Sequence, residues 1–223
     1  CVGAVIFWKS RCISWEETVI SQENKKEPVK DTSIVYISNC FVGSDMTAHA
    51  FDSLVEKVNE KKPDVILFGG NLFGRHTKEV TVDKTLASIK KMKAALGIYM
   101  VEGSADSVLV EEKKEKISGA GVHLLLDESA VLHNGLQLVG CRADGKTKKP
   151  MSYTLSLINK EKPSIVLAGE AMEEKRKEEK KISLVLYPKK ITDTGNGGTS
   201  GVNQMFPRNV LASAKINFMQ IKK

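Results

Sequence analysis

Ser38-Asn39-Cys40-Phe41-Val42-Gly43-Ser44 is the first of four short polar or glycine-rich segments, each of which directly follows an apolar run. The other three are Gly69-Gly70-Asn71-Leu72, Glu102-Gly103-Ser104-Ala105-Asp106 and Leu167-Ala168-Gly169-Glu170. Short apolar runs bounded by turn residues are typical of buried strands. An open α/β sheet builds its site from loops at the carboxyl ends of such strands. The four segments therefore predict where a functional site lies.

Around these segments the chain alternates between predicted strands and helices. Strands are expected at 13–21, 34–38, 65–68, 97–101, 122–126, 130–133, 136–141, 165–168, 182–186 and 210–221. Helices are expected at 47–60, 82–96, 107–118 and 153–159. The dipeptide Asn134-Gly135 predicts a tight hairpin turn. Alternation followed by hairpins predicts an α/β fold in which two packed sheets are flanked by helices, and the strand at 210–221 is expected to close the second sheet.

In order and spacing, the four segments resemble the sequence blocks of the calcineurin-like metallophosphoesterases, and are most similar to the bacterial membrane-associated branch. The blocks of that branch read S-D-L-H-x-G-S, G-G-D-L, G-N-H-D, L-A-H and G-H-T-H. The resemblance covers residues 33–223 and implies a four-layer α/β/β/α sandwich of two mixed β-sheets flanked by helices. Residues 1–32 are then an N-terminal segment that precedes a degenerate metallophosphoesterase-like domain.

Most of the metal ligands that this resemblance implies are replaced. In block order, the family's Asp, His, Asp, Asn, His, Asp and His correspond to Asn39, Phe41, Asn71, Ser104, Ala105, Asp106 and Gly169. Only one carboxylate is therefore kept. The sequence has no G-H-T-H block, and after the predicted strand at 182–186 it continues instead through 187–190 into a glycine-rich stretch, 191–201.

The family uses two divalent metal ions, such as Mn, Fe or Zn, which clamp a phosphate and activate water. Two such ions about 3.5–4 Å apart repel each other and need anionic ligands, above all a bridging carboxylate. Asn71 is neutral, and Asp106 alone cannot hold a binuclear centre. We therefore expect no metal cofactor and no catalytic residue, and we interpret the seven positions as a vestigial site.

Two functions of different classes are open. The first is a non-catalytic scaffold or binding module, tethered to a membrane or forming a subunit of a larger complex, with a protein as its partner. In one form of it, the cleft binds an anion through Arg75, Lys189 or Lys190, because both residue types bind phosphate. The alternative is a metal-dependent phosphoesterase that hydrolyses a phosphate ester or a phospholipid headgroup. That activity would require the bridging carboxylate and the G-H-T-H loop.

The chain is basic, with a net charge of +7 over 223 residues. Its basic residues are 29 Lys and 5 Arg, and no nucleic-acid-binding motif accompanies them. Lysine-rich runs such as 113–116 and 173–181 also contain glutamates, a pattern typical of solvated helix faces. We therefore expect no nucleic-acid partner, whereas an anionic membrane surface stays open.

The first residues, Cys1-Val2-Gly3-Ala4-Val5-Ile6-Phe7-Trp8, form a short apolar run that is followed by Lys9. A bilayer-spanning helix takes about 20 residues, so this run alone is too short. We interpret it as the end of a membrane anchor, because the resembling branch carries an N-terminal membrane segment. A lipidated cysteine and an ordinary strand are the alternatives. Membrane-associated and cytoplasmic localisation both stay open.

Overall fold

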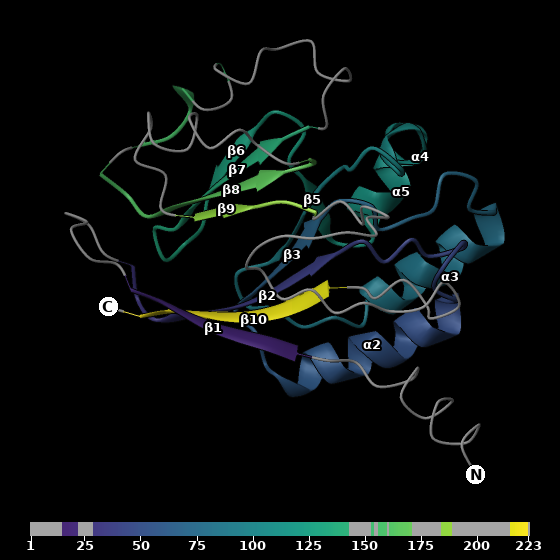
Figure 1. Ribbon diagram of the computed structural model, residues 1–223, viewed down its shortest axis with the longest axis horizontal. Coiled ribbons are helices and arrows are strands. Elements are labelled where there is room, and N and C mark those ends of the chain that lie inside the picture. The colour runs from purple at the N-terminus through teal and green to yellow at the C-terminus, as the bar shows by residue number, and fades with distance from the viewer. Residues whose placement is uncertain are drawn as a thin grey trace, which may run out of the picture.

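A computed structural model describes residues 29–142, 153, 156–159, 161–170 and 184–188 of the chain. It also gives the backbone of two strands, β1 (Trp15–Ser21) and β10 (Lys215–Lys222). In this part of the chain two β-sheets pack on each other, and helices cover the other face of the larger sheet (Figure 1). The predicted α/β fold, with two mixed sheets flanked by helices, is confirmed.

The larger sheet has six strands in the order β1-β10-β2-β3-β4-β5. Its parallel part consists of β2 (Thr32–Ser38), β3 (Val65–Gly69), β4 (Ile98–Val101) and β5 (Val122–Leu124). β2, β3 and β4 are apolar and buried almost throughout. Parallel strands covered on both faces read as continuous apolar runs, which is why the sequence reveals them well. β10 pairs antiparallel to β2 and makes the sheet mixed.

β10 lies in a different sheet from the one predicted. The strand at 210–221 was expected to close the second sheet, but β10 runs between β1 and β2 of the larger sheet. Alternating apolar residues fit any sheet with a buried face, so the pattern could not identify the partner strand. β1 pairs parallel to β10, and the predicted strand within segment 1–32 therefore forms the edge of the larger sheet. The predicted domain boundary at residue 32 stays a prediction.

The smaller sheet contains β6 (Ser129–Val131), β7 (Gln137–Cys141), β8 (Ser164–Ala168) and β9 (Leu184–Leu186), in that order. β6 and β7 are antiparallel, whereas β7, β8 and β9 run parallel to one another. The predicted hairpin turn joins β6 to β7. Gly135 adopts φ 89° there, and its N–H donates to the Leu132 carbonyl at 2.8 Å.

Four helices follow strands of the larger sheet: α2 (Ala48–Glu60), α3 (Glu79–Ile89), α4 (Ser107–Glu112) and α5 (Lys114–Gly119). α2 begins as predicted, because Thr47 caps it. The Thr47 hydroxyl oxygen accepts the N–H of Ala50 at 3.1 Å, which satisfies one of the free donors of the first turn.

The later helices differ from the prediction in their ends. α3 stops at Ile89 rather than continuing to residue 96. The Asn59 side chain on α2 explains this, because it donates to the Lys91 carbonyl and accepts from the Lys93 N–H, both at 2.9 Å. The single helix expected at 107–118 is divided at Lys113. The helix expected at 153–159 does not include 157–159.

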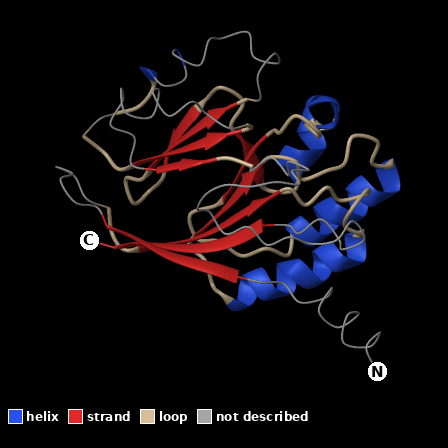
Figure 2. Ribbon diagram, in the orientation of Figure 1, coloured by secondary structure: helices blue, strands red, loops and turns tan. Residues whose placement is uncertain are grey.

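Figure 2 distinguishes the helices from the strands of the two sheets. Two apolar layers hold these elements together. One layer joins the larger sheet to its helices, with Phe68 of β3 packed near Phe51 of α2 at a ring-centroid distance of 6.4 Å. The other lies between the two sheets, where Leu67 of the larger sheet and Leu138 of the smaller sheet are fully buried. This second layer fixes the carboxyl ends of both sets of parallel strands relative to each other.

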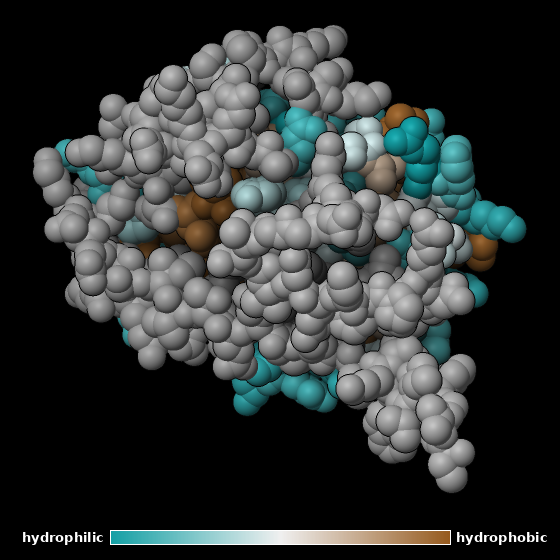
Figure 3. Space-filling model, in the orientation of Figure 1, coloured by the Kyte–Doolittle hydropathy of each residue, from teal (hydrophilic) through white to brown (hydrophobic). Residues whose placement is uncertain are grey.

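The described surface around α4 and α5 is mostly hydrophilic (Figure 3). Lys116 on α5 pairs with Glu79 and Asp83 on α3, and its side chain is 50% exposed. The expectation that the run at 113–116 is a solvated face is confirmed. Among the residues that the structure describes, none of the helices is both long enough and apolar enough to span a bilayer. Residues 1–14 and the run at 173–181 lie outside this description.

Candidate functional site

The first two predicted segments meet directly at the carboxyl ends of β2 and β3. Asn39 donates its backbone N–H to the Gly70 carbonyl at 3.1 Å, and Phe41 donates to the Asn71 carbonyl at 2.9 Å. Parallel neighbours end at the same edge of a sheet, so the two loops leave it side by side. The edge that the sequence predicted as a site is therefore a single connected structure.

The backbone at this edge has an unusual conformation. Asn39, Phe41 and Asn71 have φ values of 56°, 45° and 55°, in the left-handed region. Asparagine tolerates that region, whereas a bulky residue such as Phe41 is strained in it. Strain of this kind persists where the surrounding structure imposes it, and it is concentrated at functional sites. All three of these left-handed residues lie in the loops that follow β2 and β3.

The Asn71 side-chain amide connects three of the predicted site positions. Its Nδ2 donates to Asn39 Oδ1 at 2.8 Å, and its Oδ1 accepts the Ala105 N–H at 3.0 Å. Asn39 and Asn71 are both buried. Their side-chain oxygens therefore already accept hydrogen bonds within the protein.

Gly103 leaves the space in which this network fits. A Cβ atom on Gly103 would lie 2.3 Å from Asn71 Oδ1 and 2.6 Å from the Asn71 backbone nitrogen. Gly70 approaches from the other side, since its own Cβ would lie 3.0 Å from the Gly103 Cα. The second and third segments thus pack backbone against backbone.

Asp106 is fully buried and accepts backbone hydrogen bonds with both carboxylate oxygens. Oδ2 accepts the N–H of Leu72 at 2.6 Å and that of Phe73 at 3.4 Å, and Oδ1 accepts the N–H of Gly103 at 2.7 Å. Burial raises the pKa of Asp106 to about 7, although these hydrogen bonds oppose the rise. The Asp106 carboxyl group therefore joins the loops after β3 and β4.

The remaining predicted positions are placed differently. Gly169 follows β8 in the smaller sheet, where its N–H donates to the Cys141 carbonyl at 2.8 Å. Ser104 and Arg75 are exposed in the loops after β4 and β3. Lys189 and Lys190, the other two predicted anion ligands, lie outside the described residues. An anion site built from Arg75, Lys189 and Lys190 stays a prediction.

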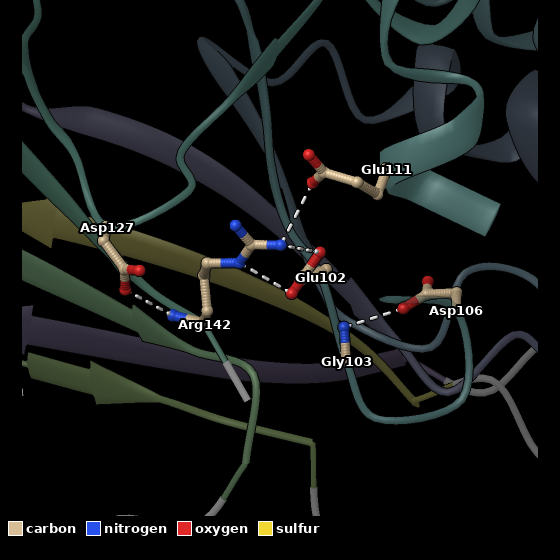
Figure 4. A network of polar contacts seen from close by, with 6 residues as sticks. All are labelled: Glu102, Gly103, Asp106, Glu111, Asp127 and Arg142. Atoms are coloured by element: carbon tan, nitrogen blue, oxygen red, sulfur yellow. Dashed lines mark hydrogen bonds and ion pairs between the residues drawn. The ribbon is translucent and has the colours of Figure 1, made fainter. Parts of the chain in front are cut away.

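Two charged residues that pair at this edge were not singled out from the sequence. Glu102, directly after β4, is completely buried, and Arg142, directly after β7, reaches it from the smaller sheet (Figure 4). Arg142 Nε lies 2.8 Å from Glu102 Oε1, and Nη2 lies 3.2 Å from Oε2. An arginine next to a buried strand, in a chain with 5 arginines, was the available signal.

The side chains at the predicted ligand positions do not fit a pair of divalent metal ions. Asn39 and Asn71 are neutral, and Phe41, Ala105 and Gly169 have no ligand atoms in their side chains. Asp106 is the single carboxylate among the seven predicted positions, and its two oxygens also accept backbone N–H groups. Within the described part of the chain, no group of three or more His, Cys, Asp or Glu side chains is arranged to hold a metal ion. This donor set lacks the anionic ligands that two adjacent dications need.

Comparisons with known proteins find similarity both in sequence and in fold. The chain is similar to an uncharacterized metallophosphoesterase of Helicobacter pylori, with 25% identity over 189 residues. The match covers 82% of this chain and 48% of the relative, so the chain spans about half the length of that protein. The crystal structure of TT1561 from Thermus thermophilus has a similar fold, with a TM-score of 0.52 and 15% identity. That similarity covers 85% of this chain and 88% of TT1561. A scan against models of known protein families gives no match.

Proposed function

Because the sequence match and the shared fold support a metallophosphoesterase family for this chain, we propose that it is a non-catalytic member of that family. In this proposal the hydrolase fold serves as a scaffold or binding module. It works as a subunit of a larger protein complex or in association with a membrane. The expected partner is a protein, and an anionic membrane surface is a second contact that the basic chain favours.

The observation that carries this proposal is the hydrogen-bonded state of Asn71. A bridging ligand between two dications must offer a free anionic oxygen, but Asn71 is neutral and its oxygen accepts the Ala105 N–H at 3.0 Å. Two dications repel each other about four times as strongly as two unit charges at the same distance. Without a bridging carboxylate, this repulsion has no local compensation.

The neighbouring groups do not supply the missing charge. Asp106 is buried and holds the loops after β3 and β4 together, and it supplies at most one negative charge. Asn39 already accepts a hydrogen bond from Asn71. The side chains thus support each other, which is how a site can keep its shape after losing its ligands.

A second candidate function is metal-dependent hydrolysis of a phosphate ester or phospholipid headgroup. Its support is the similarity to a protein named a metallophosphoesterase, together with the retained Asp106. The two candidates differ in what they require of Asn71, since hydrolysis needs a bridging carboxylate at that position.

An assay with bis(p-nitrophenyl) phosphate separates the two candidates. We expect the protein supplied with Mn²⁺ or Zn²⁺ to release nitrophenol no faster than the metal ion alone, because the two-metal centre cannot form. A known two-metal phosphoesterase in the same buffer is the positive control. Turnover above the blank that is lost in Asp106→Asn would support hydrolysis and overturn the non-catalytic proposal.

A further inference from the structure

The Arg142–Glu102 ion pair connects the two sheets at the edge where the vestigial site lies. Glu102 follows β4 of the larger sheet and Arg142 follows β7 of the smaller sheet (Figure 4). The side chain of Glu102 is 0% exposed and that of Arg142 is 18% exposed. The two contacts of 2.8 Å and 3.2 Å are bidentate, the geometry that gives arginine–carboxylate pairs both strength and a fixed orientation.

Further contacts hold Arg142 in place. Its Nη2 also lies 3.1 Å from Glu111 Oε2 on α4, and its backbone N–H donates to Asp127 Oδ1 at 3.1 Å. Burial lowers the pKa of Arg142, but Glu102 and Glu111 raise it more, so that it stays above its usual value. The guanidinium is thus a fixed positive charge between the sheets.

Glu102 connects the ion pair to the loops of the vestigial site. The next residue, Gly103, donates its N–H to Asp106 Oδ1 at 2.7 Å. Asp106 Oδ2 in turn accepts the Leu72 N–H at 2.6 Å, and the side chain of Asn71, next to Leu72, donates a hydrogen bond to Asn39 Oδ1. A continuous series of contacts therefore runs from β7 through the ends of β4 and β3 to the end of β2.

We propose that the Arg142–Glu102 pair is a latch between the two sheets that positions the loops of the vestigial site. The first three sequence blocks follow strands of the larger sheet and the fourth follows β8 of the smaller sheet. Metal ions bound by all four blocks would join the sheets, and here an internal cation makes the connection. The inference rests on the proposed function, because an intact metal centre would itself hold the loops together.

Hydrogen exchange of the Leu72 and Gly103 amides tests the latch. In metal-free protein with chelator, Arg142→Met should accelerate exchange of both amides by about tenfold or more, because it leaves the buried Glu102 unpaired. Amides in the middle of α2, on the helical side of the larger sheet, should change by less than about threefold. Glu102→Gln should have a similar local effect.

Two controls make the result specific. Glu111→Gln makes the same chemical change as Glu102→Gln in the other carboxylate that pairs with Arg142. Because Glu111 is 56% exposed, we expect the exchange rates of the two amides to change by less than about twofold. Arg142→Lys keeps the charge but loses the bidentate contact, so its exchange rates should lie between those of the unmodified protein and Arg142→Met. It replaces Arg142→Met as the test if that variant does not fold. The double variant Glu102→Gln/Arg142→Met should exchange no faster than the faster of the two single variants.

The outcomes separate the latch from the proposed function. Unchanged Leu72 and Gly103 exchange in Arg142→Met, or additive effects in the double variant, would overturn the latch. Neither outcome bears on catalysis. Hydrolysis by the unmodified protein would overturn the non-catalytic proposal without changing the exchange result measured in chelator.

Discussion

Replacing Asp106 with alanine should lower the free energy of unfolding by about 3–5 kcal/mol. The fully buried carboxylate accepts three backbone N–H groups, from Leu72, Phe73 and Gly103. A buried donor left without a partner costs about 1–3 kcal/mol, and these losses are not fully additive. In a chain of this size the melting temperature should fall by roughly 6–20 °C. Thermal unfolding followed by circular dichroism measures the change.

Asp83→Ala is the matched control, because it removes an aspartate whose side chain is 53% exposed and paired with Lys116. An exposed ion pair contributes at most about 1 kcal/mol, so its melting temperature should change by no more than a few degrees. Equal effects of the two substitutions would contradict the role given to Asp106.

The pH dependence of the same transition gives an independent check on Asp106. The folded-state pKa is raised to about 7, above the unfolded value of about 3.9. Between these values the folded protein keeps a proton that the unfolded chain loses, so the free energy of unfolding falls as the pH rises from about 4 to about 7. Asp106→Asn cannot titrate and should lack this contribution.

Replacing Gly103 with alanine should also lower the free energy of unfolding strongly. The Cβ of Gly103→Ala would lie 2.3 Å from Asn71 Oδ1 and 2.6 Å from the Asn71 backbone nitrogen. Because one of these atoms belongs to the backbone, relief requires the loops after β3 and β4 to separate. Overpacking typically costs about 1–3 kcal/mol, and we expect a loss at or above about 3 kcal/mol because the Asn71 hydrogen bonds are disturbed as well. Urea unfolding measures this difference.

Gly119→Ala is the control for Gly103→Ala. Gly119 ends α5, and a Cβ there would meet no atom within 4 Å. Alanine restricts the unfolded chain and favours helix, so this variant should be neutral or more stable by up to about 1 kcal/mol. If Gly103→Ala were as stable as Gly119→Ala, the close contact between the second and third segments would be wrong.

The sequence predicted the buried strands of the larger sheet well, for a physical reason, whereas a functional site at their ends stays a prediction. Strands such as β3 are apolar throughout because both faces are covered, and their polar ends are visible as changes in composition. Parallel topology then brings the loops after β2, β3 and β4 to one edge of the sheet. Asn39, Asn71 and Asp106 could therefore be expected at the same edge of the sheet before their contacts were known.

The features that the sequence did not predict depend on contacts between residues far apart in the chain. The end of α3 is set by Asn59 on another helix, and the sheet that β10 joins is set by its pairing with β2. The local periodicity of apolar residues carries no information about either of these contacts. The Glu102–Arg142 pair spans 40 positions, and Glu102 looks like an ordinary solvated residue until the burial of its loop is known.

The metal content of the purified protein tests the central claim most directly. The protein is loaded with Mn²⁺, Zn²⁺ or Fe²⁺, desalted and measured by elemental analysis beside Asp106→Ala. We expect less than about one equivalent per chain in both proteins, because the neutral Asn39–Asn71 pair and the single carboxylate of Asp106 cannot offset the charge of two dications. About two equivalents in the unmodified protein, lost in Asp106→Ala, would contradict the vestigial site and identify a working metal centre.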